Sequence, residues 1–152
     1  SFKKFKSKLM LKFFKDKVKN KVNYKENSFS KIASLLIYAA KLDEDYTEKE
    51  EQIIKKTLLD LGAKSSEINE FILNAKTLEK NSNQILDFTK EVKNMPELEK
   101  KKVIESLWKI IYSNNEADIY ETNLMRRLTG LLYIDSKTMG EIKEKVKKQL
   151  NK

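Results

Sequence analysis

Apolar side chains recur at steps of three and four residues along almost the whole chain, which is the spacing of one face of an α-helix. No stretch alternates apolar and polar residues over the length of a strand, and hairpin-type turn dipeptides are missing. The pattern therefore predicts an all-α bundle of about seven or eight helices joined by short connections.

Local start and stop signals divide the chain from residue 28 onward into helices. Thr47 and Glu50 have the spacing of a capping box, Gly62 is expected to end that helix in a left-handed conformation, and Pro96 suits the first turn of a later helix. The apolar positions of the predicted helices are Ile32, Leu35, Leu36, Ala39, Ala40, Ile53, Ile54, Leu58, Leu61, Ile68, Phe71, Ile72, Ala75, Ile85, Phe88, Val92, Leu98, Val103, Leu107, Trp108, Ile111, Leu124, Leu128, Leu131, Met139, Ile142 and Val146.

The chain also matches itself when it is offset by 71 residues, which indicates an internal duplication of a helix–acidic corner–helix unit. The aligned pairs are Leu36 with Leu107, Asp43 with Asn114, Asp45 with Glu116, Thr47 with Asp118, Glu50 with Glu121, Ile53 with Leu124, Ile54 with Met125, Ser65 with Ser136 and Ile68 with Met139.

Each copy places oxygen-bearing side chains on alternate residues of a corner and one more on the first turn of the next helix. Residues 43–51 hold six acids and one lysine, a local charge of −5. Hard cations such as Ca²⁺ need about six oxygen ligands and relieve the repulsion between clustered carboxylates. The corner is not an EF-hand, because Glu48 stands where that loop needs glycine and Ile54 where it needs a bidentate acid. Helix capping alone explains the presence of four of these polar residues: Thr47, Glu50, Asp118 and Glu121. It does not explain the other four, which are Asp43, Asp45, Asn114 and Glu116.

Charge is distributed very unevenly along the chain. Residues 1–25 hold ten lysines and one acid, which gives +9, whereas the remaining residues hold 22 basic and 22 acidic side chains. Within this basic segment, two apolar stripes predict an amphipathic helix, suited either to an anionic membrane surface or to packing on the rest of the domain. We therefore expect a basic amphipathic helix at 1–25 and a helical domain at 28–150. Nucleic acid is not an expected partner, since the neutral body has only two arginines.

The composition excludes several classes of chemistry. The chain has no cysteine and no histidine, which removes Ser–His–Asp and Cys–His catalysis and the usual zinc, haem and iron–sulfur ligands. Its three glycines are too widely spaced for a phosphate-binding loop or a dinucleotide fingerprint. No apolar run approaches the length of a membrane span, the longest being the six residues 35–40.

The segment Ala40-Lys-Leu-Asp-Glu-Asp-Tyr-Thr-Glu-Lys-Glu50 resembles the Ala-Asp-Gly-x-x-[Ser/Asp]-x-x-Glu corner of TerB-like domains, the tellurite-resistance family. The second corner, followed by Asn123-Leu-Met-Arg-Arg-Leu128, is similar to that family's second copy, and the resemblance covers roughly residues 30–150. Three positions depart from the family pattern. The family's glycine is Glu44 in the first copy and Asn115 in the second, and its leading Asp is Asn114 in the second copy. The resemblance implies a TerB-like helical fold whose acidic corners bind Ca²⁺ or Mg²⁺ through Asp43, Asp45, Thr47, Glu50, Glu116, Asp118 and Glu121.

From these features we expect a non-enzymatic module with no catalytic residues. It would act in a stress-response or tellurite-resistance type of complex, in the cytoplasm or at the inner face of the membrane, with a protein partner that the sequence does not name. The alternative is a metal-free helical scaffold for protein interaction, similar to the related domains of membrane-anchored DnaJ-like co-chaperones.

Overall fold

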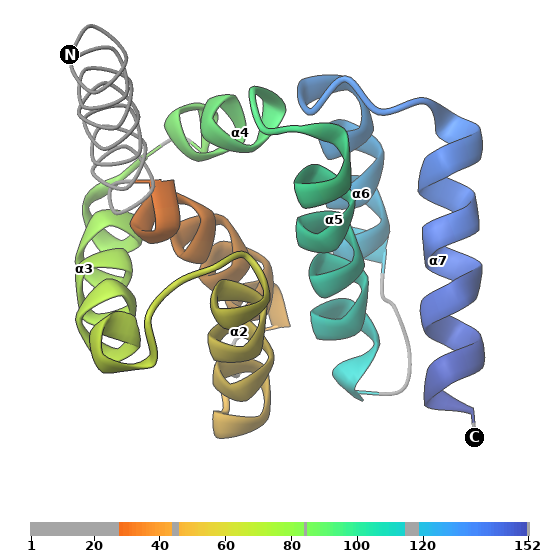
Figure 1. Cartoon of the computed structure of the whole chain (residues 1–152). Helices are drawn as coiled ribbons and strands as arrows, with labels where there is room; N and C mark the ends of the chain where they lie inside the picture. Colours follow the sequence, from red (N-terminus) through yellow and green to blue (C-terminus); the bar gives the residue numbers. More distant parts are fainter. Residues whose placement is uncertain (1–27, 44–45, 84, 115–118, 152) are drawn as a thin grey trace, which may run out of the picture.

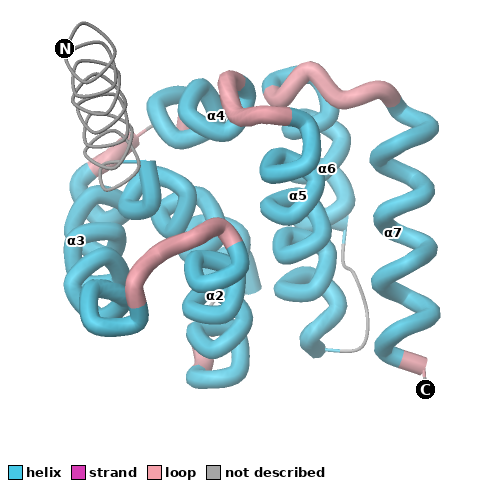
Figure 2. Tube along the Cα trace, in the orientation of Figure 1, coloured by secondary structure: helices cyan, strands magenta, loops and turns pink. Residues whose placement is uncertain are grey.

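The computed structural model describes residues 28–43, 46–83, 85–114 and 119–151, and it confirms the all-α prediction (Figures 1 and 2). This part of the chain contains seven α-helices and no strand. The basic segment, residues 1–25, and its predicted helix lie outside the described residues. The elements are a helix over residues 28–40, then η1 (Lys41–Asp43), α2 (Glu48–Asp60), η2 (Ser65–Glu67), α3 (Ile68–Asn81), α4 (Leu86–Lys93), α5 (Glu97–Ile111), η3 (Tyr112–Asn114), α6 (Ile119–Leu131) and α7 (Ser136–Leu150).

The duplication seen in the sequence recurs in the backbone at the same offset. Shifting η1 by 71 residues gives the bounds of η3, and shifting α2 gives the bounds of α6. The helix over 28–40 likewise ends where α5 does after that shift. The first copy therefore comprises the helix over 28–40, α2 and α3, and the second comprises α5, α6 and α7. Helix α4 crosses between the two groups (Figure 1) and has no counterpart in either copy.

The core runs through both copies, because nearly all the predicted apolar positions are buried. Phe29 packs on Phe71 of α3 with ring centroids 5.3 Å apart, and Ser34 donates a hydrogen bond of 3.2 Å to the Ala75 carbonyl of the same helix. Helix α5 packs against α2, α4 and α7. One prediction is wrong, since Leu98, in the first turn of α5, is 77% exposed.

The second helix of each copy, α2 in the first and α6 in the second, ends in the same backbone motif. After α2 the Gly62 and Ala63 amides bond back to the Leu59 and Leu58 carbonyls, at 3.0 and 2.9 Å, and Gly62 has a φ of 103°. This is a Schellman motif, and it confirms the predicted glycine cap. After α6 the same bonding pattern recurs around Tyr133, which stands at the position of Gly62 and has a φ of 54°. A tyrosine therefore occupies a left-handed conformation that costs a side chain about 1 kcal/mol.

The other two glycines allow a stability prediction. Gly130 and Gly140 lie inside α6 and α7, and a methyl group added at either would meet nothing within 4 Å. Gly130→Ala and Gly140→Ala should each raise the free energy of unfolding by about 0.5–1 kcal/mol, because alanine is the better helix former. Urea denaturation measures this change. The matched control is Gly62→Ala, which should lower stability instead, since its positive φ disfavours a side chain.

Candidate functional site

The start of α2, which follows the first acidic corner, and η3, which leads into the second, lie at the same end of the molecule (Figure 1). Ser113, which directly precedes Asn114, donates a hydrogen bond of 3.2 Å to the Glu50 carboxylate of α2. Lys49 Nζ also donates a 2.8 Å hydrogen bond to the Ser113 carbonyl oxygen. Two adjacent side chains of α2 thus hold η3, which follows α5 and leads into the second corner.

Among the predicted site residues whose side chains the structure describes, Glu50 is the most buried, with 1% of its surface exposed. Its carboxylate accepts a hydrogen bond of 3.0 Å from the Thr47 backbone N–H and another from the Thr47 hydroxyl, as part of the predicted capping box. Together with the Ser113 bond, these contacts satisfy a carboxylate that is withdrawn from water. Glu50 therefore fixes the start of α2 and connects the two copies.

Glu51, the next acid of the first corner, is neutralised by lysines. Lys76 of α3 lies 2.8 Å from its carboxylate, Lys55 lies 3.8 Å away, and the Tyr46 hydroxyl donates to it at 3.2 Å. The Lys76 hydrogen bond lowers the pKa of Glu51, so these contacts stabilise the fold above pH 4.5 and are lost as the pH falls through the folded-state pKa. Partial burial of the hydroxyl raises the pKa of Tyr46 above its usual range, and the negative charge of the neighbouring Glu51 raises it further.

In the second copy, Glu121 occupies the place of Glu50 in the first turn of α6 and is 5% exposed. The pKa of Tyr112 is raised, first by burial and then by the negative charges of Glu144 and Glu121. The buried acid is thus a feature of both copies.

The structure describes the side chains of Thr47, Glu50 and Glu121 among the predicted metal ligands. Those of Asp43, Asp45, Glu116 and Asp118 lie outside the described side chains. Among the described residues, no group of three or more acidic, histidine or cysteine side chains is placed to hold a metal ion.

Sequence reasoning missed three residues that shape this end of the molecule. In the sequence, Ser113 directly precedes the second corner and Tyr46 lies in the first. Their hydroxyl groups are the only sequence signal that could have indicated a contact with the corner acids. Lys76 lies 25 positions after Glu51, and no local pattern indicates that the two meet.

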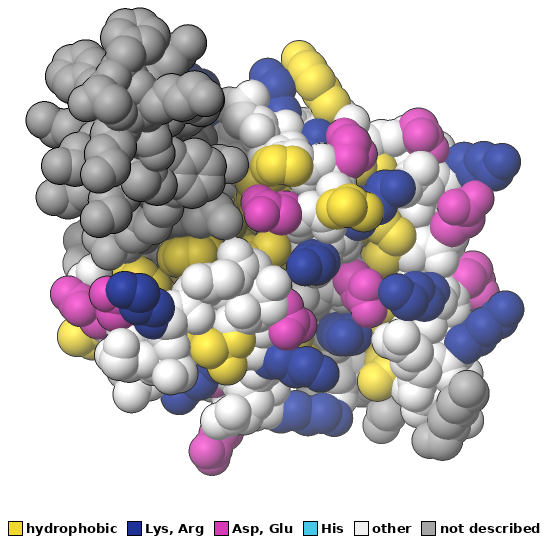
Figure 3. Space-filling model, viewed as in Figure 1, with side chains coloured by type: hydrophobic (Ala, Val, Ile, Leu, Met, Phe, Trp, Pro, Cys, Tyr) yellow, Lys and Arg dark blue, Asp and Glu magenta, His cyan; other side chains and the backbone are white. Residues whose placement is uncertain are grey.

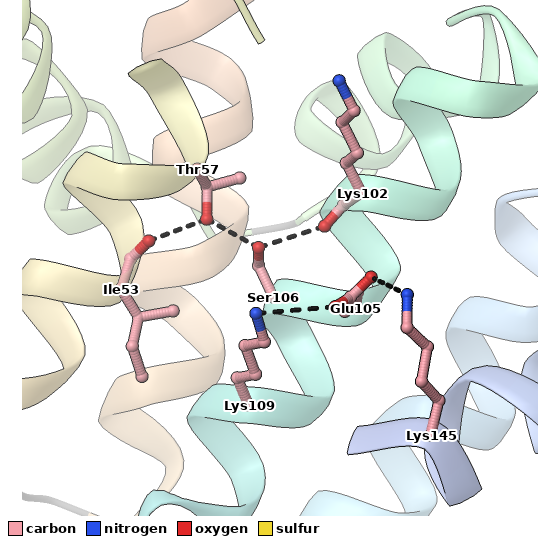
Figure 4. Close-up of polar contacts among 7 residues, drawn as sticks. All are labelled: Ile53, Thr57, Lys102, Glu105, Ser106, Lys109 and Lys145. Atoms are coloured by element: carbon pink, nitrogen blue, oxygen red, sulfur yellow. Dashed lines mark hydrogen bonds and ion pairs between the residues drawn. The ribbon is translucent and has the colours of Figure 1, made fainter. Parts of the chain in front are cut away.

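A polar seam joins the copies farther along α2 and α5 (Figure 4). Thr57 and Ser106 bring their hydroxyl oxygens within 2.6 Å of each other, and each hydroxyl also bonds to a carbonyl of its own helix. Beside them is an open cleft of about 300 Å³, lined also by Glu105 and Lys109. Glu105 pairs with Lys109 at 3.5 Å and with Lys145 of α7 at 3.2 Å. Each hydroxyl is engaged by the other and by a carbonyl of its own helix, so the seam joins the two copies through hydrogen bonds.

Charged side chains of both signs are interspersed over the face seen in Figure 3. No helix among the described residues combines the length and the apolar character needed to cross a bilayer.

The fold and the site together define a duplicated all-α domain with an acidic corner in each copy. The sequence model for tellurite resistance protein TerB matches residues 29–144, and the chain belongs to this family. Comparisons with curated proteins and with solved structures found no match.

Proposed function

We propose that this chain is a non-enzymatic binding module of the tellurite-resistance type whose two acidic corners share a divalent cation. The observation that supports it most is the Glu50–Ser113 hydrogen bond, which brings the start of α2 within 3.2 Å of the residue before the second corner. Since the two copies are joined at this point, we infer that the acids of both corners are directed at one ion.

The described contacts narrow the proposed ligand set. Glu50 is buried and engaged by Thr47 and Ser113, so we assign it, with Thr47 and Glu121, the role of positioning the corners. The ligands are then the four acids Asp43, Asp45, Glu116 and Asp118. Carboxylate oxygens on alternate residues suit Ca²⁺ or Mg²⁺, which prefer hard oxygen ligands.

Thermal unfolding of the full chain with and without added Ca²⁺ or Mg²⁺ tests this proposal. An ion that binds only the folded state raises Tm, by about 2–5 °C at an ion concentration ten times Kd. Asp43→Ala with Asp45→Ala should abolish the rise. Asp60→Ala with Asp87→Ala is the matched control, since it removes two exposed aspartates outside the corners and should retain the rise. Calorimetric titration with Ca²⁺, Mg²⁺, Mn²⁺ and Zn²⁺ then gives the preferred ion, and no change in Tm at millimolar ion would contradict the proposal.

The second candidate is a metal-free helical scaffold that binds a partner protein. It is favoured by the partners of the described corner acids, because Glu50 is held by hydrogen bonds and Glu51 by Lys76. A chain whose Tm is indifferent to every ion would support this alternative.

We also propose that the basic segment, residues 1–25, holds the module at an anionic membrane surface. Its ten lysines would each contribute about 1 kcal/mol near such a surface, and its phenylalanines would add apolar burial. The full chain should sediment with vesicles containing phosphatidylserine, and binding should weaken at least about 100-fold when residues 1–25 are removed. Neutral vesicles are the control. Equal sedimentation of the two chains would contradict the proposal.

A further inference from the structure

An ammonium group of the chain itself lies against the first acidic corner. Lys76 Nζ, from α3, is 2.8 Å from Oε1 of Glu51 and 5.6 Å from the centre of the Tyr46 ring. The Tyr46 hydroxyl donates a hydrogen bond of 3.2 Å to the same carboxylate oxygen. A positive charge between a carboxylate and an aromatic ring is held by the same forces that hold a bound cation.

Helix α3 contacts the chain on both sides of this corner. Lys41, in η1, pairs with Glu79 of α3 at 2.7 Å, and Glu79 shares a face of α3 with Lys76 because it lies three residues later. In the sequence, Lys41 precedes the acids at 43–45 and Tyr46 follows them. These acids are thus only a few residues from contacts made by α3, so that their charges act on the Lys76 ammonium over a screening length of about 8 Å.

Glu51 alone does not use up the positive charge placed beside it. Besides Lys76, its second oxygen has Lys55 of α2 at 3.8 Å. Two lysines carry one more charge than a single carboxylate neutralises. The surplus acts on the other acids of the corner, where residues 43–51 have a net charge of −5.

The second copy cannot form the same ion pair. At the offset of 71 residues, Glu51 corresponds to Thr122, which carries no charge, and Lys76 corresponds to Lys147. Residues 114–122 hold three acids and no basic residue, a charge of −3. The more acidic of the two corners is therefore the one in which an ammonium of the third helix lies against an acid.

We propose that Lys76 is a resident cation of the first corner, whose tethered ammonium competes with free divalent ions for the negative charge there and so weakens their binding. The ammonium keeps Glu51 occupied and repels an ion that enters the corner. Because it belongs to the chain, it is present at every ion concentration and raises the concentration at which an ion can bind. The inference deepens the proposed function, since it concerns the same corner, but the two are tested by different comparisons.

Calorimetric titration of the full chain and of Lys76→Met with Ca²⁺ and Mg²⁺ tests this proposal, at about 0.05 M salt to limit screening. Methionine has a similar length and no charge. The variant should bind the ion at least about fivefold more tightly, because a positive charge near a divalent ion has been removed. The ion pair is partly exposed, so the variant should stay folded, which circular dichroism checks.

Two further variants separate the charge of Lys76 from its other contacts. Lys76→Arg keeps the positive charge and should bind ions as the wild type does. Lys90→Met is the matched control, because it removes an exposed lysine of α4, outside the corner, and changes the net charge by the same amount. It should leave ion affinity unchanged.

The ion affinity of the wild type tests the shared cation, whereas the difference between the wild type and Lys76→Met tests the resident cation. If the wild type binds no ion and Lys76→Met gains binding, the shared cation is contradicted and the resident cation is supported. Equal affinities of the wild type and Lys76→Met overturn the inference, as does the absence of ion binding by both. An equal gain in Lys90→Met or in Lys76→Arg overturns it as well.

Discussion

Leu107→Ala should lower the free energy of unfolding by about 3–4 kcal/mol, because it removes a fully buried side chain and leaves a cavity that the helices fill only in part. Leu107 is 0% exposed and lies in α5, which packs against three other helices. Urea denaturation monitored by circular dichroism measures the change. Its counterpart in the first copy, Leu36, is also 0% exposed, so Leu36→Ala should have an effect of similar size.

The matched control for this prediction is Leu98→Ala, the same substitution on the same helix. Leu98 is 77% exposed, and its replacement should change stability by no more than about 0.5 kcal/mol. Equal effects at Leu98 and Leu107 would show that α5 is not oriented as described.

Glu50→Ala should lower the free energy of unfolding by about 2 kcal/mol. The substitution removes the acceptor for the Thr47 backbone N–H and breaks the Glu50–Ser113 hydrogen bond between the copies, although the Ser113 hydroxyl keeps the Ile110 carbonyl as a partner. Thermal or urea unfolding of the variant in metal-free buffer measures the loss without any contribution from bound ions.

Two further variants serve as controls. One removes the charge of Glu50 while keeping a hydrogen-bond acceptor, and the other removes the neighbouring acid Glu51. Glu50→Gln retains one carbonyl acceptor and should destabilise less than Glu50→Ala. Glu51→Ala removes an acid one position later whose ion pairs face solvent, and it should cost about 0.5 kcal/mol. If Glu50→Ala cost no more than Glu51→Ala, the buried hydrogen bonds would not hold the corner.

Local patterns in the sequence were sufficient to predict most of the fold. Apolar positions three and four residues apart predicted the helices. The capping-box spacing of Thr47 and Glu50 marked the start of α2, and Gly62 marked its end. These signals act within a few residues, so they are readable without a structure. The offset of 71 residues predicted the duplication, which the bounds of α2 and α6 reproduce.

Long-range contacts of the candidate site were not predictable in this way. The burial of Glu50 depends on the end of α5, and the neutralisation of Glu51 depends on a lysine of α3. Leu98 lies in the first turn of α5, three and four residues before the exposed Lys101 and Lys102, so it belongs to the solvent-facing side of that helix. The ligand roles of Asp43, Asp45, Glu116 and Asp118 remain predictions.

The matching turns after α2 and α6 show how two halves of one molecule can diverge without changing shape. In both, a backbone amide reaches a carbonyl five residues earlier, so the path of the chain is set by main-chain bonding. The residue at the apex of the turn can therefore be something other than glycine, at the modest energetic cost of an unfavourable φ. One half has the unstrained glycine at the apex, and the other has an outward-facing aromatic ring on the same backbone path.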